Sequence, residues 1–135
     1  MDDACRDEFD ALVETQLAEL PYTVQLLLQE TPLVVEDHPS EALLSELGLS
    51  AEQADELCGV YFGLGMLERS VEDSFTEPEK ITIFRQGIRA LASSQVDAEQ
   101  TLDELLKREI RTTILHEIGH HFGLDEDDLE AIGYA

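Results

Sequence analysis

His116, Glu117 and His120 are the residues whose types and spacing could do chemistry, in the segment His116-Glu117-Ile118-Gly119-His120. On an α-helix, residues four apart lie about 40° apart around the axis and one turn along it, so both imidazoles can converge on one metal ion. Glu117 follows His116 directly and turns toward the same side. This HExxH spacing is typical of zinc hydrolases.

Each residue type in the motif has a chemical reason. Neutral imidazoles suit Zn²⁺, and a catalytic zinc site keeps one position open for a water molecule. The metal lowers the pKa of that water and polarises a carbonyl group. Glu117 would take the proton from the water and later pass it to the leaving amine. We therefore predict that His116 and His120 bind zinc and that Glu117 is the catalytic base.

The surroundings of the motif favour a metal site over a chance match. Residues 112–122 carry a single formal charge, at Glu117, and a helix that is apolar nearly all round is buried. The alternative is a helix that happens to carry two histidines. That alternative does not explain why the Glu117 carboxylate would be buried, because burial of a carboxylate without a partner destabilises the folded state.

Zinc needs a third protein ligand, and Gly123 allows the chain to turn back toward the metal. Three residues further on stands Glu126, which is the predicted ligand, with Asp125 as its competitor. The same acidic run could instead begin a final helix over residues 127–132, as an N-cap and an acidic first turn. The two interpretations are compatible.

Helices and short strands alternate along the rest of the chain. Thr101 and Glu104 match a capping box that begins the motif helix, and Gly123 is expected to end it. Apolar spacing and turn residues predict the other elements. These are helices over 9–20, 23–29, 40–47 (with Ser40 as N-cap and Gly48 at its end) and 86–91, strands over 33–35, 60–62 and 81–85, a loop over 68–79 and a connector over 92–96.

Composition restricts the partners. The formal net charge is -23 over 135 residues, which argues against nucleic acids and anionic membranes. Length and apolar content predict one domain over residues 1–135. Cys5 and Cys58 form no metal or disulfide pattern, and both are expected to be buried in a reducing compartment. The acidic N-terminus has no signal-peptide pattern and no membrane span is evident, so we expect a cytoplasmic protein.

The C-terminal residues HEIGHHFGLDEDDLEAIGYA closely resemble the minimal zincin family of small bacterial metallopeptidases. The segments LVVED (33–37), LERSVEDS (67–74) and ITIFR (81–85) look like the same family, so the resemblance covers most of the chain. It implies a compact α+β fold, with a small mixed sheet packed against the active-site helix and several other helices. It also implies zinc bound by His116 and His120, with Glu117 as the base.

The extended motif is also similar to that of the metzincins, but two features differ. Their third ligand is usually His or Asp, and this sequence has Glu126 in that place. No methionine follows Glu126, so the Met-turn of that group is missing.

Other polar residues are expected to have structural roles. We predict that His121 is a buried or supporting histidine, His38 an exposed turn residue and Arg85 an ion-pair partner. Tyr134 is expected to pack the C-terminus rather than to reach the metal cleft as an oxyanion donor. Arg69 and Ser70 are expected either to line the cleft or to lie on a surface loop.

The leading functional hypothesis is a zinc-dependent peptidase acting on a peptide or protein. Its extended substrate would lie along a sheet edge, for which the predicted strand Ile81 to Arg85 is the candidate. A second hypothesis is a non-catalytic metal-binding or interaction protein that retains the site. A structural zinc site is disfavoured, because such sites usually have Cys and His ligands and no use for Glu117. The sequence leaves the oligomeric state open.

Overall fold

A computed structural model describes residues 2–62 and 79–121, and it combines helices with one small mixed sheet. The three strands are β1 (Leu33–Glu36), β2 (Gly59–Phe62) and β3 (Lys80–Phe84), in the order β1-β3-β2. β1 runs parallel to β3, and β2 runs antiparallel to it. The predicted α+β fold with a small mixed sheet is therefore confirmed.

β3 is the central strand, so the expectation that it forms the open edge of the sheet was wrong. It pairs with β1 from Leu33↔Ile81 to Glu36↔Phe84 and with β2 from Gly59↔Ile83 to Phe62↔Lys80. Both sides of its backbone are thus engaged in hydrogen bonds. Ile81, Ile83 and Phe84 are fully buried, and such an apolar, β-branched sequence suits a strand covered on both faces.

The helices agree with the predicted positions but differ at their ends. They are α1 (Asp3–Glu19), α2 (Tyr22–Glu30), α3 (Glu41–Leu47), the 3₁₀-helix η1 (Ala51–Glu56), α5 (Arg85–Ser94) and α6 (Leu102–His121). α1 begins earlier than predicted, because the Asp2 side chain accepts a hydrogen bond from the Cys5 N–H and so caps it. Within the described ranges, no helix is long and apolar enough to cross a membrane.

The region after β3 contains two further corrections. Arg85 was assigned to the strand but is the first residue of α5, and the predicted connector over 92–96 is helical as far as Ser94. Ala92 is fully buried in the main core, which explains why the helix continues past the apolar pattern that was used to predict it. η1 was not predicted, because six residues without buried side chains show no helical periodicity.

The predicted caps of α3 and the predicted capping box of α6 are confirmed. Ser40 accepts a hydrogen bond from the Leu43 N–H at the start of α3, and Gly48 ends that helix in the left-handed conformation with φ 71°. At α6, the Thr101 hydroxyl accepts from the Glu104 N–H at 3.2 Å, and the Glu104 carboxylate accepts from the Thr101 N–H at 3.3 Å. This reciprocal pair begins the helix that carries the motif.

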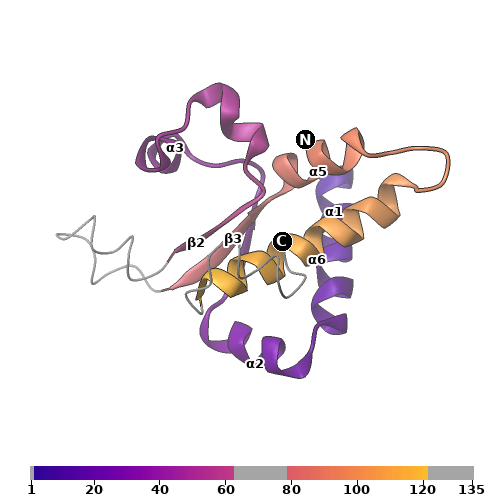
Figure 1. The fold of residues 1–135 in the computed structure, drawn as a ribbon, viewed down its shortest axis with the longest axis horizontal. Helices are drawn as coiled ribbons and strands as arrows, with labels where there is room; N and C mark the ends of the chain where they lie inside the picture. The colour runs from indigo at the N-terminus through magenta and orange to yellow at the C-terminus, as the bar shows by residue number, and fades with distance from the viewer. Residues whose placement is uncertain (1, 63–78, 122–135) are drawn as a thin grey trace.

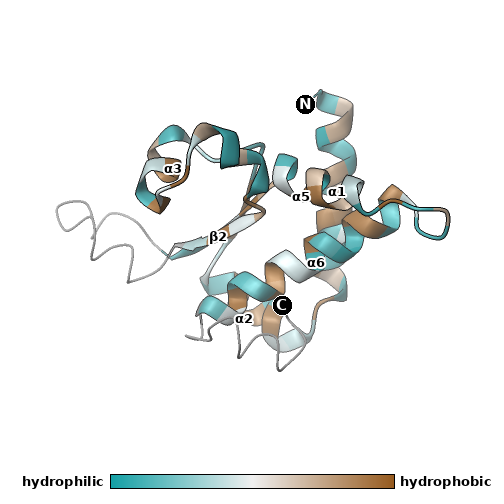
Figure 2. Ribbon diagram, turned by 45° about the horizontal axis from the view of Figure 1, so that its top comes forward, coloured by the Kyte–Doolittle hydropathy of each residue, from teal (hydrophilic) through white to brown (hydrophobic). Residues whose placement is uncertain are grey.

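The main core lies on one face of the sheet, between the strands and the helices α1, α5 and α6. α6 contacts α1, α5, β2 and β3, and Figure 1 shows its yellow end beside β2 and β3. Hydrophobic and hydrophilic residues are interleaved along α1 and α6 (Figure 2), as expected for helices with one buried face. A smaller cluster of Leu43, Val60 and Phe84 joins α3 to the strands.

Four charged side chains connect α1 to the ends of β1 and β3. Arg85 pairs with Asp10 of α1 and with Asp37, which follows β1, at 2.9 Å each. Arg6 of α1 also pairs with Asp37, at 2.6 Å. The predicted role of Arg85 as an ion-pair partner is thus confirmed, and its side chain is only 13% exposed. The Arg6 and Arg85 guanidinium groups hold the pKa of Asp37 below its usual value.

Candidate metal centre

α6 positions the motif residues by burying one side of the helix. Its apolar residues Leu105, Ile110, Ile114 and Ile118 are at most 5% exposed and belong to the main core. This packing fixes the rotation of the helix and brings Thr113 and Glu117 against β2 at Gly59.

The side chains of His116, Glu117 and His120 come together on this helix, with Glu117 buried and both histidines half-buried. Their potential ligand atoms all lie within 4.8 Å of one another. The two imidazole rings are 4.7 Å apart between centroids and are inclined at 78°, an edge-to-face arrangement. Among the described residues, this is the only group of three or more His, Cys, Asp and Glu side chains close enough to hold a metal ion.

The donor set fits zinc. Zn–N bonds of about 2.0–2.1 Å in a tetrahedral site place two nitrogen ligands ~3.4 Å apart, which small rotations of side chains within 4.8 Å can reach. Both histidines are half-buried, and His116 lines the adjoining pocket. Two imidazoles and an adjacent carboxylate are also the groups that zinc hydrolysis requires.

Glu117 is 8% exposed, as the uncharged segment around it predicted. Its Cγ would be 3.4 Å from a Cβ placed on Gly59, and the Cγ2 of Thr113 only 2.8 Å from the same position. The lack of a side chain at Gly59 therefore allows α6 to lie directly against β2. Of the described buried side chains, none has a nitrogen or oxygen atom without a hydrogen-bond partner.

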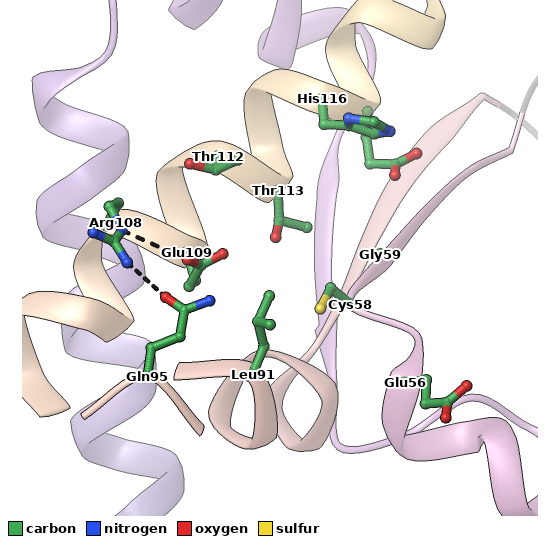
Figure 3. Close-up of a pocket in the computed structure, with 11 residues that line it drawn as sticks. Glu56, Cys58, Gly59, Leu91, Gln95, Arg108, Glu109, Thr112, Thr113 and His116 are labelled. Carbon is green, nitrogen blue, oxygen red and sulfur yellow. Dashed lines mark hydrogen bonds and ion pairs between the residues drawn. The ribbon is translucent and has the colours of Figure 1, made fainter. Parts of the chain in front are cut away.

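A pocket of about 560 Å³ adjoins the motif (Figure 3). It extends from His116 and Glu117 along α6 toward Glu109 and Arg108, with α5 and the start of β2 opposite. The lining residues are Glu56, Cys58, Gly59, Leu91, Gln95, Arg108, Glu109, Thr112, Thr113, His116 and Glu117. The candidate metal centre therefore forms one end of a hollow large enough for a side chain or a short peptide segment.

Cys58 lines this pocket, although we expected it to be an ordinary buried residue. Both cysteines are free and only partly buried, so the expectation of full burial was wrong. Burial, together with the negative charges of Glu109 and Glu117, raises the pKa of the Cys58 thiol to about 11. The thiol is therefore neutral at physiological pH, and it does not belong to the cluster of possible metal ligands.

Sequence reasoning missed most of the pocket. Glu109, Thr112 and His116 are three and four residues apart, and Glu109, Thr113 and Glu117 are four apart, so their shared face could have been found from the sequence. The residues opposite, such as Cys58 and Leu91, come from other elements and gave no such signal.

The remaining candidates are divided between surface positions and parts of the chain outside the description. His38 is exposed in a bend, as predicted. The predicted third ligand Glu126 and its competitor Asp125 lie outside the described residues, as do Tyr134 and Arg69. Ser70 and the side chain of His121 are likewise not described.

Comparison with known families agrees with the geometry. A sequence model of zincin-like metallopeptidases matches residues 28–134, which is most of the 135-residue chain. The chain belongs to the zincin-like metallopeptidase family. This confirms the resemblance drawn from the motif and from the segments upstream of it. The match begins within α2, so β1, β2, β3 and α6 all lie inside the zincin-like region. No curated protein matches the chain in a sequence search.

Proposed function

We propose that this zincin-like protein is a zinc-dependent peptidase in which His116 and His120 bind the metal and Glu117 is the catalytic base. The observation that carries the proposal is the convergence of these three side chains, of which His116 and Glu117 line one end of a pocket. Membership of a metallopeptidase family supports the same activity. We further propose Glu126 as the third metal ligand, with Asp125 as the alternative.

Zinc, when bound, supplies a Lewis acid that polarises the peptide carbonyl and makes a water molecule acidic near neutral pH. The chain's own contribution is to place a proton acceptor beside the metal ligands. Glu117 is fixed against β2 by the close approach of α6 at Gly59. From that position its carboxylate would accept the proton of the attacking water and then donate it to the leaving nitrogen.

We propose β2 as the edge along which an extended peptide binds. Among the described strands, β2 and β1 are at the edges of the sheet, and β2 is the one that contacts α6. Peptides commonly add to an exposed strand through main-chain hydrogen bonds. A peptide on β2 would pass beside His116 and Glu117, which lie on the part of α6 next to that strand.

The Glu117→Gln variant tests the role of the base. We expect the variant to bind zinc at the wild-type stoichiometry, because Glu117 is not a ligand in this proposal. Its cleavage of a broad peptide library should fall by roughly 10²–10⁴-fold, the usual contribution of a general base. Metal analysis and mass spectrometry of the cleaved library measure the two properties, with His38→Ala as the control for removal of a histidine outside the site.

Zinc binding without any cleavage by the wild-type protein would favour the alternative, a non-catalytic metal-binding protein. Cleavage that persists unchanged in Glu117→Gln would contradict the proposed mechanism and indicate a contaminating protease. Loss of a histidine ligand should instead remove zinc. His116→Ala and His120→Ala are therefore expected to abolish stoichiometric binding, and retention of zinc in both would refute the site.

The third ligand can be assigned by comparing Glu126→Ala with Asp125→Ala. We expect Glu126→Ala to weaken zinc affinity by about a hundredfold or more and Asp125→Ala to change it little, because only a direct ligand contributes a bond to the metal. Competition with a chromogenic chelator measures both affinities. The reverse order of effects would assign the ligand to Asp125.

A further inference from the structure

We propose that the pocket beside the motif selects a long basic side chain of the substrate, with Glu109 as the residue that recognises its positive charge. This inference rests on the proposed peptidase function and names the class of substrate that the site would take. It follows from the shape of the pocket, the position of Glu109 within it and the chemistry of its walls.

The position of Glu109 sets the length of the side chain. Glu109 precedes His116 by seven residues, which is about 10 Å along the helix axis at ~1.5 Å per residue. Both residues line the same pocket, so one continuous hollow connects them. A substrate residue held near His116 would therefore need a long, extended side chain to reach the Glu109 carboxylate.

The walls between the two ends suit the methylene chain of such a residue. Leu91 of α5 and Thr113 of α6 border this stretch from opposite sides, and the neutral thiol of Cys58 lies immediately before β2 (Figure 3). The methyl group of a threonine and the side chain of a leucine pack well against CH₂ groups. The thiol adds no charge that would repel or attract an aliphatic stem.

Glu109 retains the capacity to bind a cation. Its side chain is 12% exposed, and its ion pair with the neighbouring Arg108 is 3.6 Å long, which exceeds hydrogen-bond distance. Arg108 is 49% exposed and directs a hydrogen bond of 2.6 Å to the Gln95 side chain instead. In Figure 3 the Glu109 carboxylate lies between Arg108 and the space bordered by Thr113 and Leu91.

The charged residues that line the pocket also favour a basic side chain of the substrate. The lining contains three carboxylates, those of Glu56, Glu109 and Glu117, and one guanidinium group, that of Arg108. The whole chain carries a net charge of -23, so its field also attracts cations toward such a hollow. The carboxylates of the lining and the net charge of the chain would both repel an acidic substrate side chain.

Binding to the full-length, zinc-loaded Glu117→Gln variant tests the proposal without depending on cleavage. The probes are fluorescent peptides of one sequence that differ at a single position, which carries lysine, arginine, ornithine, 2,4-diaminobutyrate, norleucine or glutamate. We expect lysine and arginine peptides to bind about tenfold more tightly than the norleucine peptide, with affinity falling as the stem is shortened. The variable residue is placed at each position of the peptide in turn, so that the experiment also finds the register in which the peptide binds to β2.

Glu109→Gln in the same background should remove most of the preference for lysine and leave norleucine binding within about twofold, since the shape of the pocket is kept. Glu109→Lys should reverse the preference toward glutamate. Glu8→Gln, which removes an exposed carboxylate from α1 outside the pocket lining, is the matched control and should change nothing. Thermal unfolding of each variant verifies that it is folded.

The failure of this inference and that of the proposed function are distinguishable. Equal binding of lysine and norleucine peptides at every position, or a preference that survives Glu109→Gln, would overturn the role of Glu109 even if the wild-type protein cleaves peptides. A lysine preference that depends on Glu109 would support the pocket even if no peptide is cleaved.

Discussion

At the scale of single residues, the candidate site places two histidines that must be neutral beside a carboxylate that must be charged. His116 and His120 must stay neutral and accessible to hold a metal, whereas Glu117 must be ionised although it is only 8% exposed. A buried carboxylate is costly unless it is hydrogen-bonded and paired with a positive charge. The proposed metal would add a positive charge beside Glu117, so the ion that would activate water would also stabilise the ionised base.

Cys58 gives a residue-scale prediction about pH. Its pKa of about 11, against an ordinary value of 9.0, leaves roughly a hundredfold less thiolate at pH 8 than a free thiol would have. In metal-free Cys5→Ser protein, we expect iodoacetamide to react with Cys58 about a hundredfold more slowly than with the urea-unfolded chain. The rate should rise with pH up to about 11.

The charged groups that raise this pKa can be removed one at a time. Glu109→Gln should lower the Cys58 pKa somewhat and accelerate alkylation, although burial is the largest cause and remains. Native Cys58 that reacts as fast as the unfolded chain would show that the thiol is not enclosed as described.

At the scale of the elements, the contact between α6 and β2 decides where the motif lies. The contact is close because Gly59 has no side chain, and a Cβ there would meet the Thr113 Cγ2 at 2.8 Å and the Thr82 backbone oxygen at 3.2 Å. β2 is held in turn by β3, whose antiparallel pairing places Gly59 opposite Ile83. The sheet is thus the surface against which Glu117, the proposed base, is packed.

Gly59→Ala is expected to lower the free energy of unfolding by about 1–3 kcal/mol, the usual cost of overpacking, and to weaken zinc binding by displacing α6. Adding Thr113→Ser removes the nearest methyl group and should restore part of both properties. Urea unfolding and chelator competition provide the two measurements.

Gly48→Ala is the control for Gly59→Ala, because it should lower the stability of the protein without altering the candidate metal centre. Its backbone is left-handed, with φ 71°, but no atom lies within 4 Å of the added Cβ. It should therefore destabilise the protein by about 1 kcal/mol and leave zinc affinity unchanged. Unaltered zinc binding in Gly59→Ala would mean that the α6–β2 contact does not position the ligands.

At the scale of the whole molecule, an ion-pair network and a large negative charge act in opposite directions. Arg6, Arg85, Asp10 and Asp37 tie α1 to the ends of β1 and β3. The surplus of 31 acidic over 8 basic residues produces self-repulsion that salt reduces. Stability should therefore be compared across pH at constant ionic strength.

Asp37→Asn tests the network. The native pKa of Asp37 lies below its ordinary value of 3.8, chiefly through Arg6 and then through Arg85. Its contribution to stability is therefore complete above about pH 4 and is lost as the pH falls through the native pKa. At pH 7 we expect the substitution to cost about 1 kcal/mol in urea unfolding.

The difference between wild type and Asp37→Asn should shrink as the pH is lowered from 4, because the wild-type carboxyl becomes protonated. Asp3→Asn is the control, since Asp3 is 95% exposed and its pair with Arg6 contributes little. A difference that stays constant from pH 7 to acid would show that the charge of Asp37 is not what stabilises the network.

The sequence by itself determined the local features of this protein. HExxH spacing, the Thr101–Glu104 capping box and the uncharged stretch from Thr112 placed three reactive side chains on one buried helix, because helical geometry relates residues three and four apart. The Ser40 and Gly48 caps were likewise readable, since capping depends on neighbouring residues.

Only the tertiary structure decided what faces that helix. The sequence pattern of Lys80–Phe84 shows a buried strand but not its neighbours, so β3 was mistaken for an edge until its pairing with β1 and β2 was known. Cys58, Leu91 and Glu109 meet in one pocket although they belong to different elements. Such contacts depend on how the apolar surfaces of different elements pack together. The spacing of residues along the chain gives no signal of which distant elements will be in contact.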